Sequence, residues 1–73
     1  MVEQAFPYLT KNELTSLSAL LAYAAHQQNV SEAIVLEIVK KHFGINDLRQ
    51  LPRQKFEEAI RFLADVQVMH HLN

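Results

Sequence analysis

The densest concentration of chemically useful side chains in this 73-residue sequence is a run of basic residues between positions 40 and 55. The run contains one acid, Asp47, and five cations, which are Lys40, Lys41, Arg49, Arg53 and Lys55. The formal net charge of the whole chain is −1, so most of its acids lie outside this segment. An uneven distribution of charge bears on the partners that a protein attracts rather than on its fold.

The cations are expected at two kinds of helix position, and only one of these is explained by the helix dipole. Lys40 and Lys41 are predicted in the last turn of a helix, where the helix dipole favours positive charge. Arg53 and Lys55 are predicted in the first turn of the next helix, where the dipole disfavours it. Together with the unpaired N–H groups of a helix start, they would bind an anion, either nucleic-acid phosphate or the carboxylates of an acidic protein tail. The alternative is a solvated surface on which the arginines pair with the two glutamates that follow.

The sequence contains no arrangement typical of catalysis or metal binding. It has no cysteine, which rules out disulfides, thiolate zinc ligands and a thiol nucleophile. The four histidines are His26, His42, His70 and His71. No two of them have the four-residue spacing that places metal ligands on one helix face. Glu57 and Glu58 suit a helix N-terminus, and Ser16 and Ser18 lack an identifiable base. We therefore predict a non-enzymatic protein without a metal, a cofactor or a small-molecule substrate.

Three helices are expected to position these residues, and the first is predicted over 11–28. Thr10 can cap its N-terminus, and Glu13 three residues later completes a capping box. Apolar residues then recur every three or four positions, as the buried stripe of a helix requires, at Leu14, Leu17, Leu21 and Ala24.

The second helix is predicted over 31–43. Ser31 can cap its start, and Gly44 stands where a left-handed residue commonly ends a helix. Its buried stripe is expected to contain Ile34, Val35, Ile38, Val39 and either His42 or Phe43. The helical spacing and the two caps outweigh the strand preference of its β-branched residues.

The third helix is predicted over 52–70, after a connector with one short turn around 47–49. Pro52 fits the first position of a helix, because its missing N–H needs no partner there. Leu48 and Leu51 of the connector are expected to pack into the core. The buried face of the helix is predicted from apolar residues at helical spacing, which are Phe56, Ala59, Ile60, Leu63 and Val66.

These elements predict an all-α fold, a compact bundle of three main helices in which residues 1–9 form an N-terminal arm and 10–73 a single domain. Hydrophobic residues make up 49% of the chain. Four of them lie off the main stripes and would suit an apolar interface, namely Leu36, Phe62, Met69 and Leu72. The alternative to anion binding is therefore a small structural or adaptor protein. It would act through this face, as a homodimer or in a tight heteromeric contact.

Part of the sequence resembles a helical module at the C-termini of phage proteins. The similar residues are KHFGINDLRQLP at 41–52 and FEEAIRFL at 56–63. Similar runs occur at the C-termini of phage antirepressors. A looser version occurs at the C-termini of single-strand annealing recombinases of the Red beta kind. The resemblance covers about residues 34–64 of this sequence. It implies a helical module accessory to DNA transactions that, in annealing recombinases, contacts partner proteins, including the acidic tail of single-strand-binding protein. The positions that match this role are the five basic residues between 40 and 55.

The relatives that this resemblance suggests carry the module behind a larger DNA-binding or annealing domain. This sequence lacks such a domain, so an excised fragment and a stand-alone protein both stay open. No run approaches the roughly 18 apolar residues of a membrane span, and the absence of cysteine suits a reducing cytoplasm. We expect a cytoplasmic, phage-like interaction module that binds nucleic acid or an acidic protein tail through residues 40–55.

Overall fold

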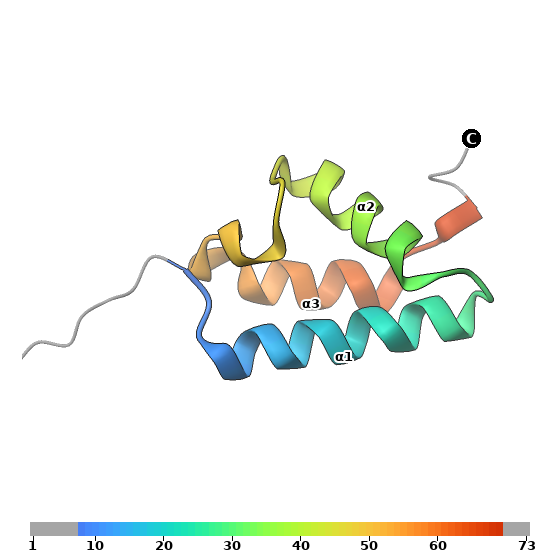
Figure 1. Cartoon of the computed structure of the whole chain (residues 1–73), viewed down its shortest axis with the longest axis horizontal. Coiled ribbons are helices and arrows are strands. Elements are labelled where there is room, and N and C mark those ends of the chain that lie inside the picture. Colours follow the sequence, from blue (N-terminus) through green and yellow to red (C-terminus); the bar gives the residue numbers. More distant parts are fainter. Residues whose placement is uncertain (1–7, 70–73) are drawn as a thin grey trace, which may run out of the picture.

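The computed structural model describes residues 8–69 as helices joined by short turns (Figure 1). The three α-helices are α1 (Lys11–Gln27), α2 (Glu32–Phe43) and α3 (Phe56–Asp65). Two short 3₁₀ helices, η1 (Leu48–Gln50) and η2 (Arg53–Lys55), connect α2 to α3. The prediction of an all-α bundle of three main helices is confirmed.

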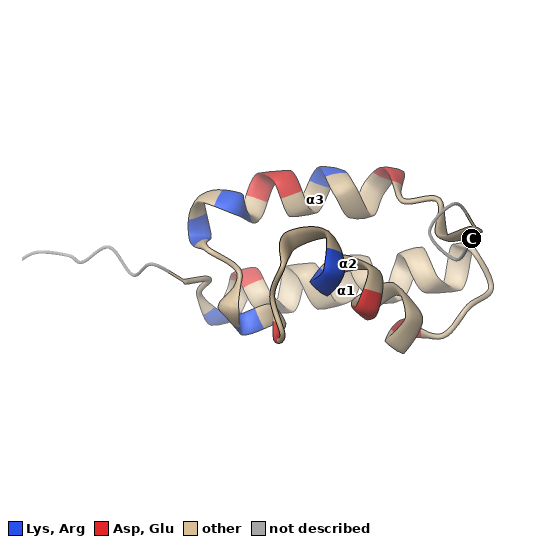
Figure 2. Cartoon of the chain, turned by 90° about the horizontal axis from the view of Figure 1, so that it is seen from above, with Lys and Arg blue, Asp and Glu red and all other residues tan. Residues whose placement is uncertain are grey.

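The helices form two layers around one core. α1 and α3 run side by side in the same direction, and α2 returns across them (Figure 1 and Figure 2). α1 packs against both of the other helices. No polar or charged side chain among the described residues is buried, and the buried core consists of Leu9, Leu17, Leu21, Ala24, Ala25, Val35, Ile38, Val39, Leu51, Ala59, Leu63, Val66 and Val68.

The start of α1 follows the predicted capping box. The Thr10 hydroxyl accepts a hydrogen bond from the N–H of Glu13 at 3.1 Å, and the Glu13 carboxylate accepts one from the N–H of Thr10 at 2.8 Å. These two bonds satisfy donors that a helix start otherwise leaves without partners. α1 ends at Gln27, and Gln28 is its C-cap.

Both predicted caps of α2 are present. The Ser31 hydroxyl accepts a hydrogen bond from the N–H of Ile34 at 3.3 Å. Gly44 ends the helix with a φ of 67°, a left-handed conformation that glycine adopts without steric cost. Phe43 is half-buried against the core and His42 is exposed, so Phe43 takes the last position of the stripe.

The start of the third helix differs from the prediction. Pro52 has an extended ψ of 142° and forms an antiparallel bridge with Tyr8 rather than opening an α-helix. The next three residues form η2, in which the N–H of Lys55 donates to the carbonyl of Pro52 at 2.9 Å. An extended Pro52 cannot be the first residue of an α-helix, so the helical turns start after it, with η2 and then with α3 at Phe56.

The end of the third helix was also predicted wrongly, since α3 stops at Asp65 and not at residue 70. Val66 is extended, with a ψ of 134°. The side-chain amide of Gln28 donates to the carbonyl of Val66 and accepts from the N–H of Val68, the second bond being 2.7 Å long. This side chain replaces the helical hydrogen bonds and lets Val66 and Val68 enter the core. Residues 68–69 are helical again, and His70, His71 and Leu72 lie outside the described residues.

Candidate functional site

The five basic residues predicted as a site are distributed over three elements. Lys40 and Lys41 stand in the last turn of α2, Arg49 in η1, and Arg53 and Lys55 in η2. The basic positions of α2 lie apart from those that precede α3 (Figure 2). Arg53 and Lys55 stand in η2, and Lys55 is the N-cap of α3, so neither lies in the first turn of that helix as predicted.

The two lysines of α2 differ in their surroundings. Lys40 Nζ lies 2.9 Å from Glu37 Oε2, and only 24% of the Lys40 side chain is exposed. Lys40 also lies near enough to Asp47 to help lower the pKa of that carboxyl group. Lys41 is exposed and forms no ion pair with any described residue.

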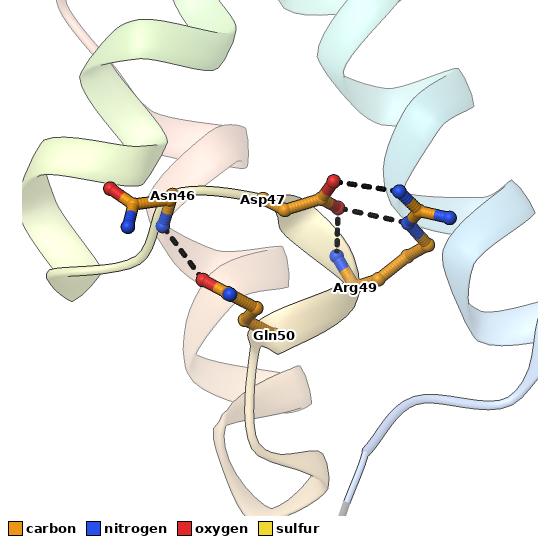
Figure 3. Close-up of polar contacts among 4 residues, drawn as sticks. All are labelled: Asn46, Asp47, Arg49 and Gln50. Atoms are coloured by element: carbon orange, nitrogen blue, oxygen red, sulfur yellow. Dashed lines mark hydrogen bonds and ion pairs between the residues drawn. The ribbon is translucent and has the colours of Figure 1, made fainter.

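Arg49 is bound by Asp47 within the connector (Figure 3). Asp47 Oδ1 accepts hydrogen bonds from the backbone N–H of Arg49 at 2.8 Å and from Nε at 3.1 Å, and Oδ2 accepts one from Nη2 at 2.9 Å. These bonds hold the pKa of Asp47 well below its ordinary value and raise that of Arg49. A two-pronged contact of this kind is stronger than a single exposed ion pair, so Arg49 is the most firmly paired of the five cations.

Arg53 and Lys55 also face carboxylates. Arg53 Nε lies 3.4 Å from Glu13 Oε2, which connects η2 to the start of α1. Lys55 Nζ lies 3.4 Å from Glu58 Oε1. Four of the five predicted cations are thus ion-paired, and within residues 8–69 Lys41 is the one that is not.

Beside the lysines of α2 lies a shallow apolar groove, which we call the α2 groove. It has a volume of about 790 Å³ and extends along α2 to the turn after Gly44. Its apolar floor is formed by Ile34, Ile38 and Ile45, and its charged rim by Glu37, Lys40 and Lys41. A Cβ atom added at Gly44 would meet no other atom within 4 Å, so the groove is open at this end.

A smaller hollow of about 360 Å³ adjoins the α2 groove between α1, α2 and the connector. The two hollows share Ala33, Lys40 and Asn46 as lining residues. The N–H of Asn46 donates to Gln50 Oε1 at 2.9 Å, and its side-chain amide points away from the Asp47–Arg49 pair (Figure 3). The amide of Asn46 therefore adds a polar group at the junction of the two hollows.

The four apolar residues predicted as an interface have different surroundings. Leu36 and Phe62 are half-buried and pack against the core. Leu36 lines the hollow beside the connector, whereas Phe62 lines another, of about 390 Å³, with His42. Met69 is 69% exposed, and Leu72 lies outside the described residues. Leu36 and Phe62 thus do not share one apolar face.

The histidine of α2 contributes to packing. The ring of His42 stacks on that of Phe62 with centroids 4.1 Å apart, and it meets Phe43 edge-on at 4.8 Å. In the part of the chain that the structure describes, no three or more histidines and acids are grouped as metal ligands would be. None of the helices within residues 8–69 is long and apolar enough to cross a membrane.

Comparisons of the chain with protein-family models, with curated proteins and with solved structures give no match. Reasoning from the sequence named the lysines of the α2 groove but assigned Ile34 and Ile38 only to the core. A signal for the groove is nevertheless present, since Glu37 is the one polar residue between 33 and 39. The other six residues of this stretch are apolar, which is more than one buried stripe of a helix needs.

Proposed function

We propose that this chain is a protein-interaction module whose α2 groove binds a short segment of a partner protein. The segment carries aliphatic side chains for the isoleucine floor and a carboxylate for the rim. The observation that supports this proposal is the placement of Ile34, Ile38 and Ile45 beside Lys40 and Lys41 around one open volume. Apolar concavities with a few polar groups at the edge are typical of binding sites.

The floor and the rim have different roles in this proposal. Burying one aliphatic side chain contributes about 1.5–3 kcal/mol. An exposed ion pair contributes only about 0–1 kcal/mol, because water and salt screen it. The isoleucines therefore supply most of the affinity, and the lysines select the charge and orientation of the segment.

An acidic protein segment suits the described cations better than nucleic acid does. Affinity for nucleic acid arises mainly from the counterions that several cations release when they contact phosphates. Here only Lys40 and Lys41 of the five cations line the groove, and the floor beside them is apolar, which suits aliphatic side chains better than phosphates.

The test is an amide-resolved NMR titration of the full chain with a synthetic peptide of alternating leucine and aspartate. We expect shifts at the amides of Ile34, Ile38, Lys41 and Ile45. Ala33→Glu places a bulky acid at an exposed position of the groove and should weaken binding by about tenfold, or 1.4 kcal/mol. Its matched control is the same change at Ala19, an exposed alanine of α1, which should leave the affinity unchanged.

The proposal is wrong if the peptide shifts no amide, or if Ala33→Glu and Ala19→Glu bind it equally. A parallel titration with a short single-stranded oligonucleotide tests the other partner class. Shifts over residues 40–55 that fade with salt would favour nucleic acid instead. Salt-insensitive shifts at Leu36, Phe62 and Met69 that depend on protein concentration would favour self-association through apolar residues.

A further inference from the structure

We infer that Glu37 occupies, in the free protein, the position that the partner's carboxylate takes in the complex. This inference rests on the proposed function of the α2 groove. Glu37 Oε2 lies 2.9 Å from Lys40 Nζ, and Glu37 is the one acid among the described residues that line the groove. The rim therefore already contains the interaction that an acidic segment would make.

The two side chains of this ion pair differ in how far they are exposed to solvent. The Glu37 side chain is 71% exposed, whereas that of Lys40 is 24% exposed and is one of the residues shared by both hollows. An exposed pair between neighbours on one helix is weak and readily exchanged. Glu37 can swing into solvent while Lys40 stays in place, so an incoming carboxylate finds a cation already positioned.

The spacing of the lining residues indicates what the segment must look like. Ile34, Ile38 and Lys41 recur at intervals of three and four, so they lie along one side of α2. The turn after Gly44 brings Ile45 to the same groove. Lys40 and Lys41 follow Ile38 by two and three residues, a rise of roughly 3 and 4.5 Å along the helix axis. An extended chain advances about 3.3 Å per residue. The partner's carboxylate is therefore one or two residues from its aliphatic anchor.

The experiment compares Glu37→Gln with Glu58→Gln in titrations with the leucine–aspartate peptide. Glu58 forms the same kind of pair, three residues from Lys55, but lies outside the groove, so both variants change the net charge equally. Glu37→Gln should tighten binding by about two- to fivefold, as expected for release of one exposed ion pair. Glu58→Gln should leave the affinity unchanged. A peptide with asparagine in place of aspartate should not distinguish Glu37→Gln from the unaltered chain.

Equal affinities of Glu37→Gln and the unaltered chain for the peptide would overturn the inference. So would a gain in affinity in Glu58→Gln as large as that in Glu37→Gln, because it would reveal a general effect of charge. If the peptide still binds and Ala33→Glu still weakens it, the groove remains the binding site without a competing Glu37. If the unaltered chain binds no peptide, both the groove and the role of Glu37 are refuted. Because both glutamates are exposed, circular dichroism should show the same helicity in each variant.

Discussion

At the level of single residues, the Glu13 carboxylate connects the start of α1 to the connector between α2 and α3. Oε1 accepts the N–H of Thr10 at the start of α1, and Oε2 lies 3.4 Å from Arg53 Nε in η2. The hydrogen bond from Thr10 and the positive charge of Arg53 lower the pKa of Glu13, although partial burial opposes them. The start of the first helix and the connector therefore meet at a carboxylate that forms these contacts best when it is ionised.

This pKa predicts how stability depends on pH. Because the pKa of Glu13 is lower in the folded chain than its ordinary value of 4.5, the ionised group stabilises the fold above that pH. The contribution is lost as the pH falls through the folded-state pKa. Glu13→Gln should therefore be less stable than the unaltered chain at neutral pH, and the difference should disappear in acid. Urea unfolding across the acid range measures it.

A suitable control for Glu13 is Glu57→Gln, because Glu57 is exposed and forms no ion pair with a described residue. At neutral pH, Glu57→Gln should lose clearly less stability than Glu13→Gln. A stability difference for Glu13→Gln that persists unchanged in acid would show that glutamine fails as a cap for a reason other than charge.

At the scale of elements, the junction between α1 and the end of α3 depends on Gln28. Its side-chain amide bonds the carbonyl of Val66 and the N–H of Val68, residues 38 and 40 positions away. Helix periodicity alone extends α3 beyond this point, since Leu63 and Val66 continue the buried stripe. The helix ends where it does because a side chain from another element takes over its backbone hydrogen bonds.

Gln28→Ala should destabilise the fold by about 2 kcal/mol, since two hydrogen bonds of about 1 kcal/mol each are lost. Chemical unfolding gives the stability, and faster hydrogen exchange at the amide of Val68 reports the local loss. The matched control is Gln27→Ala, whose side chain bonds only the exposed hydroxyl of Tyr23 and should cost less than about 0.5 kcal/mol. Equal losses in the two variants would contradict a special role for Gln28.

At the scale of the whole molecule, the connector completes the core rather than only joining two helices. Leu51, between η1 and η2, is fully buried, whereas Leu48 is only partly buried. A chain of 73 residues buries a smaller share of its surface than a larger domain does, so each core residue carries a larger part of the stability.

Leu51→Ala should therefore destabilise the protein by about 2–5 kcal/mol, the range observed when a buried leucine is truncated and leaves a cavity. Thermal unfolding followed by circular dichroism should show a large fall in the midpoint. Leu48→Ala changes the same side chain three residues earlier and should cost clearly less. If Leu48→Ala destabilises the protein as much as Leu51→Ala does, the exposed fractions of these two side chains do not predict their contributions to stability.

The amino-acid sequence alone predicts the fold class, the starts of α1 and α2 and the end of α2. Thr10 with Glu13, Ser31 with Ile34 and the left-handed Gly44 act within three to four residues, where helix geometry alone places the partners. The basic residues were likewise visible in the sequence, as was the excess of apolar residues on α2.

Three features depend on tertiary contacts instead: the pairing of the cations, the end of α3 and the groove beside Lys40 and Lys41. Glu13 and Arg53 are 40 positions apart in the chain, as are Gln28 and Val68. Such contacts depend on how α2 crosses α1 and α3, and no periodicity within one helix specifies that crossing. The groove, too, depends on where the chain turns after Gly44 and sets Ile45 beside Ile34 and Ile38.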